Sequence, residues 1–336
     1  MNPIQSISRR DLATAAVALA AGAVAATGGA RAQDLTEVTY LLPAPQFLVA
    51  FAPMNLADAR GYFEEEGLAV EFITVRGGAE VATQVGAGNA PVGGGIGDTS
   101  IIVRPNGVPV KSVAVLGGGA LTAVVARGDR DIDELADLEG ATISVQSFQD
   151  TTFYSLLGAM GTAGLTQGDA DIQAHGPAGV WQLFVSGEVD AMSAVPDWIV
   201  LAESQGVDVV RLSSTDVFPS MAQAIIANDA AIEESPEVVG GVVRAILRGV
   251  EDIMADPEAA AEDLIAYLQA NEFPVEPASV LPILEAYAEM VYSGQEVLGM
   301  SDAARYEAVQ SFYAEAGIIR RETPVEDLFT NQFVPQ

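Results

Sequence analysis

Alternating strands and helices run along most of this chain, and this alternation restricts the fold more than any other feature. An apolar stretch at residues 37–42 predicts a strand, a helical stretch interrupted at Gly61 follows, and residues 69–75 predict the next strand. The order strand, helix, strand is typical of a parallel crossover unit. The sequence therefore predicts an α/β protein built on mostly parallel sheets.

The same order repeats further along the chain. Strands are predicted at residues 91–94, 110–116, 121–126, 141–145, 172–174, 191–195, 207–212 and 223–227. Helices are predicted at residues 79–85, 151–163 and 178–186. Another helix should follow Asp98, which is expected to act as its N-cap. The remainder is mainly helical, with Ser235 as the expected cap of a helix that begins at Pro236.

The first 32 residues have the pattern of an export signal. A twin-arginine pair stands at residues 9–10, residues 13–26 are small and apolar, and residues 30–32 read Ala-Arg-Ala, a small-x-small cleavage site. The apolar stretch is shorter than the roughly 20 strongly apolar residues that a membrane span needs. We therefore expect residues 1–32 to be a cleaved twin-arginine-type signal peptide, and the mature chain to begin at or near Gln33.

Composition places the mature chain in the periplasm and excludes several partners. The chain has no cysteine, so it can carry neither a lipid anchor nor a disulfide. Cleavage removes three of the 15 basic and one of the 46 acidic residues, which leaves 12 against 45 and a net charge of −33. Nucleic acids and anionic lipids both need a basic patch, and Lys111 is the only lysine.

The length of the mature chain favours two domains, because 304 residues exceed what a single core usually holds. Residues 127–133 are polar and charged, and are expected to cross from one domain to the other.

Several enzyme chemistries lack their residues in this sequence. Lys111 follows valine instead of the glycine of a phosphate-binding loop, and a single histidine, His175, cannot build a zinc site without cysteines. The glycine triplets at residues 93–95 and 117–119 do not match a dinucleotide fingerprint, and no Gly-x-Ser-x-Gly elbow is present. A hydrolase with paired carboxylates stays open, although no pair stands out. The sequence predicts no cofactor, no metal and no enzyme activity.

Four short segments together carry a family resemblance. They are Gly-Tyr-Phe-Glu-Glu-Glu-Gly-Leu-Ala-Val-Glu at residues 61–71, Asn-Gly-Val-Pro-Val-Lys at 106–111, Asp-Leu-Glu-Gly at 137–140 and Ser-Gly-Glu-Val-Asp-Ala at 186–191. In order and spacing the chain resembles, from about residue 38 to 228, the type II periplasmic solute-binding proteins of ABC importers. That family includes sulfonate, taurine, nitrate and thiamine-precursor binding proteins.

The resemblance implies a two-lobed fold, each lobe a mostly parallel sheet flanked by helices, with a ligand cleft between the lobes. Lobe I would comprise residues 36–126 and 220–336, and lobe II residues 127–219. It also implies a monomer that delivers a small organic molecule to ABC permease subunits. Two alternatives remain: a ligand-sensing domain for a membrane receptor, and a pyrimidine-synthesis enzyme like the fungal members of the superfamily. The fungal enzymes use a histidine and a cysteine-rich motif, and the motif is absent here.

Ligand contacts are expected in the loops that follow the strands, because open parallel sheets present helix N-termini there. Five such loops lie at residues 43–47, 95–99, 117–120, 147–152 and 196–198, and the resemblance implies that they line the cleft. The candidate ligand-binding residues are Gln46, Phe47, Asp98, Thr99, Gly118, Ser147, Phe148, Thr151, Asp197 and Trp198. Thr152 is a further possible donor. Asp98 and Thr151 can alternatively serve only as helix caps, and Phe47 and Phe148 only as packing residues.

The charges in these loops restrict the ligand. None of the loops contains lysine, arginine or histidine, whereas Asp98, Asp150 and Asp197 lie in them. A multiply charged anion is therefore disfavoured, although a single sulfonate or carboxylate could sit on helix N-termini, or meet Arg76 or Arg104.

A neutral or cationic heteroaromatic molecule, such as a pyrimidine thiamine precursor, fits these loops better. In this interpretation Asp197 pairs with ring or exocyclic N–H groups, and Trp198 covers the face of the ring.

Overall fold

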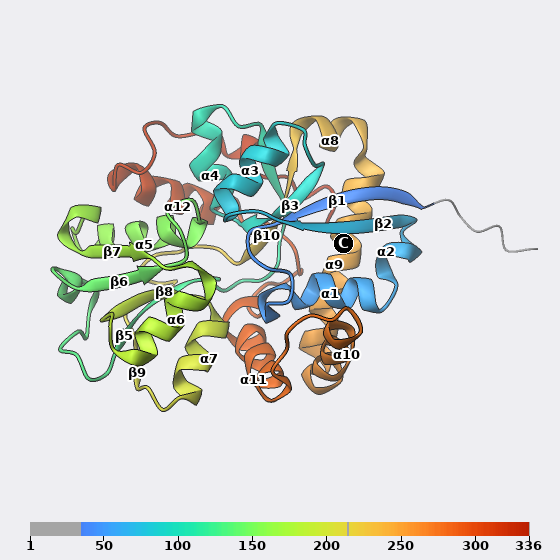
Figure 1. The fold of residues 1–336 in the computed structure, drawn as a ribbon. Coiled ribbons are helices and arrows are strands. Elements are labelled where there is room, and N and C mark those ends of the chain that lie inside the picture. Colours follow the sequence, from blue (N-terminus) through green and yellow to red (C-terminus); the bar gives the residue numbers. More distant parts are fainter. Residues whose placement is uncertain (1–34, 214, 336) are drawn as a thin grey trace, which may run out of the picture. The chain divides into compact units, whose positions relative to one another are not determined.

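The computed structural model describes residues 35–213 and 215–335. The predicted signal peptide at residues 1–32 lies outside the described residues, and it stays a prediction. Two five-stranded sheets organise the described chain, and each has helices on both of its faces (Figure 1). The predicted two-lobed α/β fold is thus confirmed.

The first sheet has the strand order β2-β1-β3-β10-β4. Its strands are β1 (Thr36–Leu42), β2 (Leu68–Thr74), β3 (Val92–Ile96), β4 (Val110–Val115) and β10 (Gln223–Asn228). β1 pairs in parallel with both β2 and β3, whereas β10 runs antiparallel between β3 and β4. The helices that accompany this sheet are α1 (Ala52–Ala59), α2 (Tyr62–Glu65), α3 (Gly78–Gly86), α4 (Thr99–Val103), α8 (Asp229–Glu234), α9 (Pro236–Ala255) and α10 (Pro257–Ala270).

The second sheet repeats this plan with the order β7-β6-β8-β5-β9. Its strands are β5 (Ala123–Arg127), β6 (Thr142–Val145), β7 (Asp171–Ala174), β8 (Ala191–Ala194) and β9 (Val209–Arg211). β6 pairs in parallel with β7 and β8, and β5 is the antiparallel strand in fourth place. Helices α5 (Thr151–Thr162), α6 (Gly176–Ser186) and α7 (Pro196–Ser204) belong to it. The chain then closes with α11 (Pro277–Tyr287), a π-helix η5 (Ala288–Tyr292) and α12 (Ala303–Glu315).

Continuous burial explains why the central strands read as apolar runs instead of alternating patterns. Every residue of β3, β8 and β10 is buried. Strands covered by helices on both faces have no side that water can reach, so they need no polar alternation.

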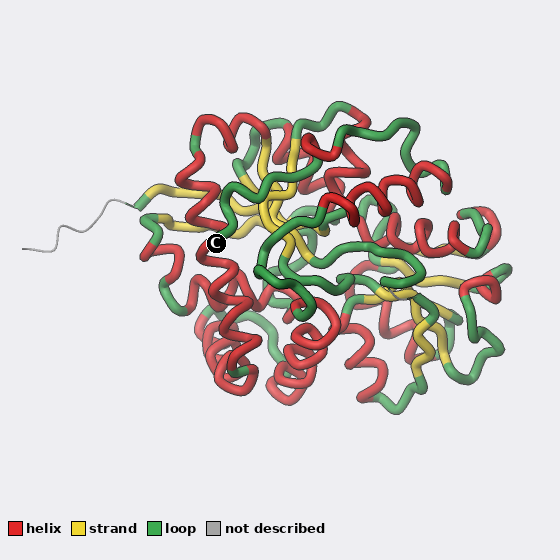
Figure 2. The backbone as a smooth tube through the Cα atoms, turned by 180° about the vertical axis from the view of Figure 1, so that it is seen from behind, coloured by secondary structure: helices red, strands yellow, loops and turns green. Residues whose placement is uncertain are grey.

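The crossings between the lobes differ from the prediction. β5 was expected to close lobe I, with the crossing at residues 127–133, but it pairs with β8 and β9 of the second sheet. The chain therefore leaves lobe I through residues 116–122, the first crossing, and returns through residues 212–213 and 215–222, the second crossing. Figure 2 shows loops, in green, that pass between the strands of the two sheets. Arg127 ends β5, and residues 128–133 form the turn and loop that follow it within lobe II. The lobe boundary predicted at 126/127 is wrong, because a short apolar strand such as β5 does not encode which sheet it joins.

The two predicted caps also differ in their contacts. Ser235 precedes α9 and Asp98 precedes α4, but neither side chain accepts a hydrogen bond from its own helix.

In residues 35–213 and 215–335 no helix combines the length and apolar character that crossing a bilayer requires. The same residues include no group of three or more acidic or histidine side chains that could hold a metal ion.

Candidate ligand-binding site

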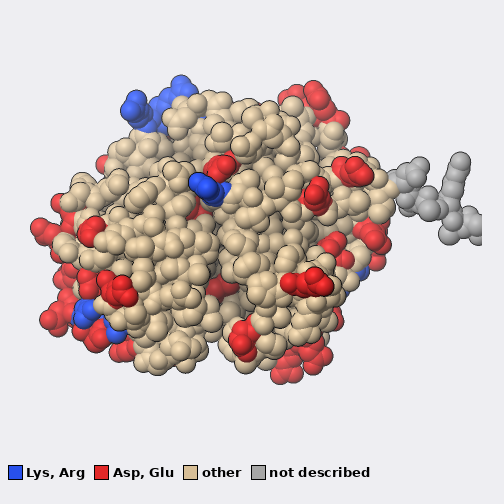
Figure 3. Space-filling model, viewed as in Figure 1, with Lys and Arg blue, Asp and Glu red and all other residues tan. Residues whose placement is uncertain are grey.

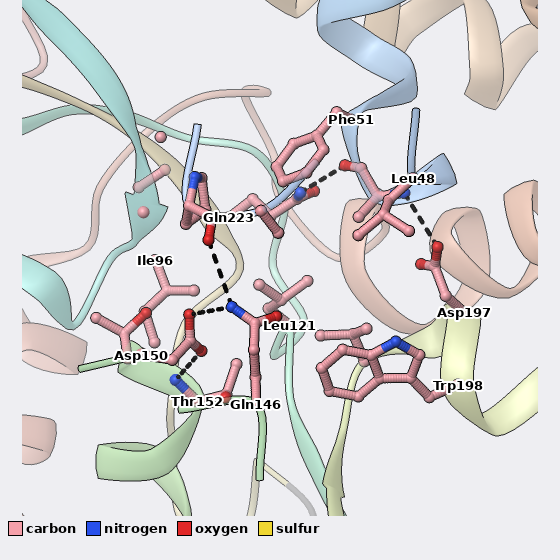
Figure 4. A pocket seen from close by; sticks show the side chains of 18 of the residues that line it. Leu48, Phe51, Ile96, Leu121, Gln146, Asp150, Thr152, Asp197, Trp198 and Gln223 are labelled. Carbon is pink, nitrogen blue, oxygen red and sulfur yellow. Dashed lines mark hydrogen bonds between the residues drawn. The ribbon is translucent and has the colours of Figure 1, made fainter. Parts of the chain in front are cut away.

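A hollow of about 630 Å³, including open solvent at its mouth, lies between the two lobes (Figure 4). It is bounded by loops at the ends of strands from both sheets, as expected for an open α/β sheet. The residues that line it are Pro43, Ala44, Leu48, Ala50, Phe51, Met54, Gly94, Gly95, Ile96, Leu121, Gln146, Asp150, Thr151, Thr152, Val195, Asp197, Trp198, Gln223 and Ala224.

The lobe I wall of the hollow is mainly apolar. Leu48, Phe51 and Met54 come from the turn after β1 and the start of α1, and Ile96 comes from the end of β3. Gln223, at the start of β10, is the polar exception on this wall. Its side-chain amide donates to the Ala50 carbonyl at 2.6 Å and its amide oxygen accepts from the Tyr292 hydroxyl at 3.3 Å. Both ends of Gln223 are therefore engaged in holding the wall together.

The lobe II wall carries the polar side chains. Gln146, Asp150 and Thr152 come from the loop between β6 and the start of α5. Asp197 and Trp198 come from the first turn of α7, immediately after β8. Pro196 at the first helical position sets the backbone for this turn.

Asp150 is buried with both carboxylate oxygens engaged. One oxygen accepts from the Thr152 backbone N–H at 2.9 Å, which caps α5, and the other accepts from the Gln146 side chain at 3.0 Å. Burial raises the pKa of Asp150 above its ordinary value. Since its oxygens are occupied within its own loop, Asp150 shapes the wall instead of offering a free acceptor.

Asp197 is also buried, but only half of its carboxylate is engaged. One oxygen accepts from the Ala50 backbone N–H of lobe I at 3.3 Å, and the other has no hydrogen-bond partner among the described residues. Burial raises the pKa of Asp197 to about 6, against smaller lowering contributions from Tyr287 and from backbone N–H groups. The nearby Tyr287 hydroxyl is also buried without a hydrogen-bond partner in the part of the chain that the structure describes. A buried carboxylate oxygen without a hydrogen bond is costly, so this atom is suited to accept from a bound molecule.

The two lobes touch around the hollow. Three hydrogen bonds join them: Ala79 N–H to the Gln149 carbonyl at 3.1 Å, the Gln146 side chain to the Pro43 carbonyl at 3.4 Å, and Ala50 N–H to Asp197 at 3.3 Å. We call the arrangement in which these bonds form the closed arrangement. Gly77 stands at one of the contacts with a φ of 90°, and a Cβ there would lie 2.9 Å from the Asp150 Cα. Only glycine permits this approach of the lobes.

The lining of the hollow has acidic side chains and no basic ones among the described residues. Among the described residues that line the hollow, none is Lys, Arg or His, and two are aspartates. Arg104 does not line it and instead pairs with Asp229 at 2.8 Å. Figure 3 shows acidic side chains spread over both lobes on the face drawn, with few basic ones. An anion would meet no compensating cation in this hollow.

Residues 49–260 match the family model described as NMT1/THI5 like. The chain belongs to the NMT1/THI5-like family. Among curated proteins, this family member is 28% identical to the riboflavin-binding protein RibY of Chloroflexus aurantiacus, over 85% of this chain and 83% of RibY. It is 25% identical to the formylaminopyrimidine-binding protein of Halalkalibacterium halodurans, over 83% of this chain and 85% of that protein.

Two further matches bear on this NMT1/THI5-like protein. Fungal 4-amino-5-hydroxymethyl-2-methylpyrimidine phosphate synthases also match, and the one from Aspergillus parasiticus is 26% identical over 64% of this chain and 66% of its own length. Among solved structures, the periplasmic aliphatic sulphonate binding protein SsuA of Escherichia coli has a TM-score of 0.66 at 16% identity, covering 90% of this chain and 92% of SsuA. The likeness to SsuA concerns the fold.

In this NMT1/THI5-like chain, three of the ten candidate residues line the hollow: Thr151, Asp197 and Trp198. Three others lie near it but face elsewhere. Gln46 donates to Asn55 and to the Tyr267 hydroxyl, and Phe47 packs against Phe273. The Ser147 hydroxyl is buried without a partner but is not part of the lining.

The remaining four candidates have other surroundings. Phe148 is 42% exposed and packs edge-on against Phe153. The Thr99 hydroxyl accepts from the Ile96 backbone N–H. Asp98 lies in a buried cluster with residues of the second crossing, and Gly118 lies in the first crossing. A ligand contact for these residues stays a prediction.

Sequence reasoning missed the lobe I wall and both glutamines. Leu48, Phe51 and Met54 read as ordinary core residues of a helix. Gln223 opens a buried apolar strand, where a polar side chain is unusual, and that contrast could have indicated a site. Gln146 follows a buried strand directly, a position that the prediction placed one residue later, at Ser147.

Proposed function

We propose that this chain is the periplasmic solute-binding component of an ABC importer, and that it captures a planar nitrogen heterocycle that is neutral or cationic. The observation that carries the ligand class is the unpaired, buried oxygen of Asp197 in a hollow without basic residues. Such an oxygen needs a donor, and ring or exocyclic N–H groups supply one.

The apolar parts of the walls support a flat ligand. Trp198 lies on the lobe II side and Phe51 on the lobe I side of the hollow (Figure 4). Aromatic side chains favour contact with planar rings, and ligand pockets commonly combine such surfaces with a few polar groups. A sulfonate or nitrate would instead need a compensating cation, and among the described residues the lining of the hollow contains no Lys, Arg or His.

The names of the curated relatives support the same ligand class. Riboflavin and formylaminopyrimidine, for which two of them are named, are both nitrogen heterocycles. We place this chain with the binding proteins and not with the synthases. The cysteine-rich motif that the resemblance assigns to the fungal enzymes has no counterpart, because the chain contains no cysteine. Its one histidine, His175, contacts the Ser144 hydroxyl at 3.0 Å and does not line the hollow.

A ligand panel tests the proposed function. We expect purified mature protein to gain thermal stability with riboflavin or with an aminopyrimidine such as formylaminopyrimidine, and not with taurine, an alkanesulfonate or nitrate. A ligand at a hundred times its Kd adds about 2.7 kcal/mol, which a melting curve resolves readily. Stabilisation by sulfonates or nitrate alone would overturn the assigned ligand class.

The periplasmic location has its own test. The processed protein should begin at or near Gln33, since Ala-Arg-Ala at residues 30–32 is the well-placed cleavage site after the apolar stretch. Mass spectrometry of a periplasmic extract measures this mass, and a product that keeps residues 1–32 would contradict export with cleavage. Replacing Arg9 and Arg10 by lysine should retain the protein in the cytoplasm if the twin-arginine route is used.

A further inference from the structure

Arg305 of α12 contacts both crossings between the lobes. Its guanidinium donates to the carbonyls of Gly118 at 2.6 Å and Gly119 at 2.9 Å in the first crossing. It also donates to the carbonyls of Pro219 at 2.9 Å and Ser220 in the second crossing. One side chain therefore joins the two segments about which the lobes must move.

The surroundings of Arg305 are unusual for a cation. The side chain is half-buried, burial lowers its pKa against the smaller raising effect of the charges on Asp98 and Asp302, and no carboxylate of the described residues lies within ion-pair distance. Backbone carbonyls are its hydrogen-bond acceptors instead. Because much of the guanidinium is withdrawn from water, these carbonyls supply the acceptors that its N–H groups need. The planar fork of arginine donors fixes their geometry in a way that a lysine cannot reproduce.

The glycine triplet of the first crossing is held from the opposite side. Gly118 N–H donates to the Ser293 carbonyl at 2.8 Å and Gly119 N–H donates to the Val291 carbonyl at 3.0 Å. A Cβ at Gly119 would lie 1.9 Å from the Met290 carbonyl oxygen. Glycine is needed here because the backbones lie in direct contact, so the crossing is confined between residues 290–294 and Arg305.

The second crossing is fixed by Asp98 and α12. The Asp98 carboxylate accepts from the Ser220 hydroxyl at 2.9 Å, from the Met221 backbone N–H at 2.8 Å and from the Tyr313 hydroxyl at 2.7 Å. Phe218 packs edge-on against Tyr313, with ring centroids 5.5 Å apart. Both crossings are thus attached to the same C-terminal helix.

We infer that Arg305 is a positioning residue that holds the two crossings together and keeps the lobes in the closed arrangement. The carbonyls of both crossings converge on one guanidinium in the same arrangement in which the lobes touch around the hollow. A hinge rotation turns the crossing backbones relative to each other and separates these acceptors. Losing the side chain therefore shifts the population towards open lobes, which weakens ligand binding without removing any ligand contact.

Arg305→Gln tests this role, with Arg321→Gln as the matched control. Arg321 is exposed and also donates to a backbone carbonyl, that of Pro105 at 3.0 Å. Pro105 belongs to neither crossing. Small-angle scattering without ligand should give a larger radius of gyration for Arg305→Gln than for wild type and Arg321→Gln. Arg305→Lys should have a radius of gyration between those of wild type and Arg305→Gln, because one ammonium can satisfy only some of the carbonyls.

The affinity measurement rests on the proposed function. With a ligand found by the panel, Arg305→Gln should bind about ten-fold more weakly, while its radius at saturation matches that of liganded wild type. The scattering comparison without ligand does not depend on the ligand class, so it tests the role of Arg305 even if the proposed ligand class is wrong. An unchanged radius of ligand-free Arg305→Gln would overturn the inference.

Hydrogen exchange in the wild-type protein covers the case in which Arg305→Gln does not fold. The amides of Gly118, Gly119 and Met221 should exchange slowly in the ligand-free protein, because each donates to a buried acceptor. Exchange as fast as that of the exposed residues Asp129 and Asp131 would show that the crossings are not held, and would refute the role of Arg305.

Discussion

The two walls of the hollow differ in chemistry although they arise from sheets of the same strand plan. The lobe I wall offers apolar side chains such as Leu48 and Phe51, and it meets polar side chains of lobe II through backbone groups, the Ala50 N–H and the Pro43 carbonyl. The lobe II wall offers two carboxylates, two hydroxyls, an amide and an indole. If the proposed function is right, this difference predicts that lobe II recognises the ligand and that lobe I covers it. A ligand should therefore bind first to lobe II and be enclosed as lobe I closes.

The two buried aspartates of lobe II sharpen the distinction between shaping the wall and recognising the ligand. Asp150 has both oxygens occupied within its own loop, whereas Asp197 keeps one oxygen free. Position in the sequence does not separate them, since each begins a helix after a buried strand. Their hydrogen bonds distinguish the two aspartates.

The largest effect is expected for Trp198→Ala. Trp198 is 3% exposed, so removing the indole should destabilise the fold by about 3–5 kcal/mol besides weakening binding. The sequence analysis predicted this side chain as a ligand contact, and its burial shows that it also belongs to the core. Urea denaturation measures the loss, with Trp198→Phe as the control that keeps most of the apolar volume. Unchanged stability of Trp198→Ala would show that the indole does not contribute to the stability of the core.

Asp197 should make stability depend on pH. The pKa of its folded form is raised by burial to about 6, so folding favours the protonated acid. The contribution of Asp197 to stability is therefore greatest below about pH 4, where the residue is protonated in both states, and falls by up to about 1.4 kcal/mol per unit as pH rises towards 6. Buried Asp98 and Asp150, whose pKa values are also raised, act in the same direction. Asp129 and Asp169, whose pKa values are lowered, act in the opposite direction. The difference between wild type and Asp197→Asn, measured by denaturation at pH 4 to 7, isolates this residue and should level off above pH 6.

The next effect concerns ligand class. Asp197→Asn should weaken binding of a heterocycle with N–H donors by about 1.5–3 kcal/mol, as expected for hydrogen bonds to a charged group. If the protein binds a sulfonate or carboxylate, the same change should strengthen binding, because a like charge is removed. Calorimetric titration gives the sign. Asp150→Asn is the matched control, and it should lower stability without changing which class of ligand binds.

The smallest effect is expected for Thr152→Val. The Thr152 hydroxyl lines the hollow and makes no hydrogen bond within the described residues, so replacing it with a methyl group should leave stability nearly unchanged. Ligand affinity should fall by about 0.5–1.5 kcal/mol if the hydroxyl contacts the ligand. Equal affinities of Thr152→Val and wild type would restrict recognition on the lobe II wall to Asp197 and Trp198.

Much of the secondary structure could be predicted because it depends on local properties. Apolar runs such as residues 223–227 and 191–195 became the buried strands β10 and β8. Glycines ended elements where a left-handed residue was expected, as at Gly67 with a φ of 76°. Asp197 and Trp198 could be assigned to the hollow because a loop after a parallel strand opens on the same edge of the sheet wherever the strand lies.

The sequence by itself therefore determined the α/β class, the cation-poor composition of the site and three residues of its lining. Tertiary structure alone decided that β5 joins the second sheet, that Asp98 holds the second crossing instead of capping α4, and that Arg305 meets carbonyls of segments about 85 and 187 residues away. Strand propensity and helix capping act over a few residues and leave a trace in local sequence. The choice of sheet partner and the acceptors of a half-buried cation depend on which distant backbones meet, and no local pattern records that choice.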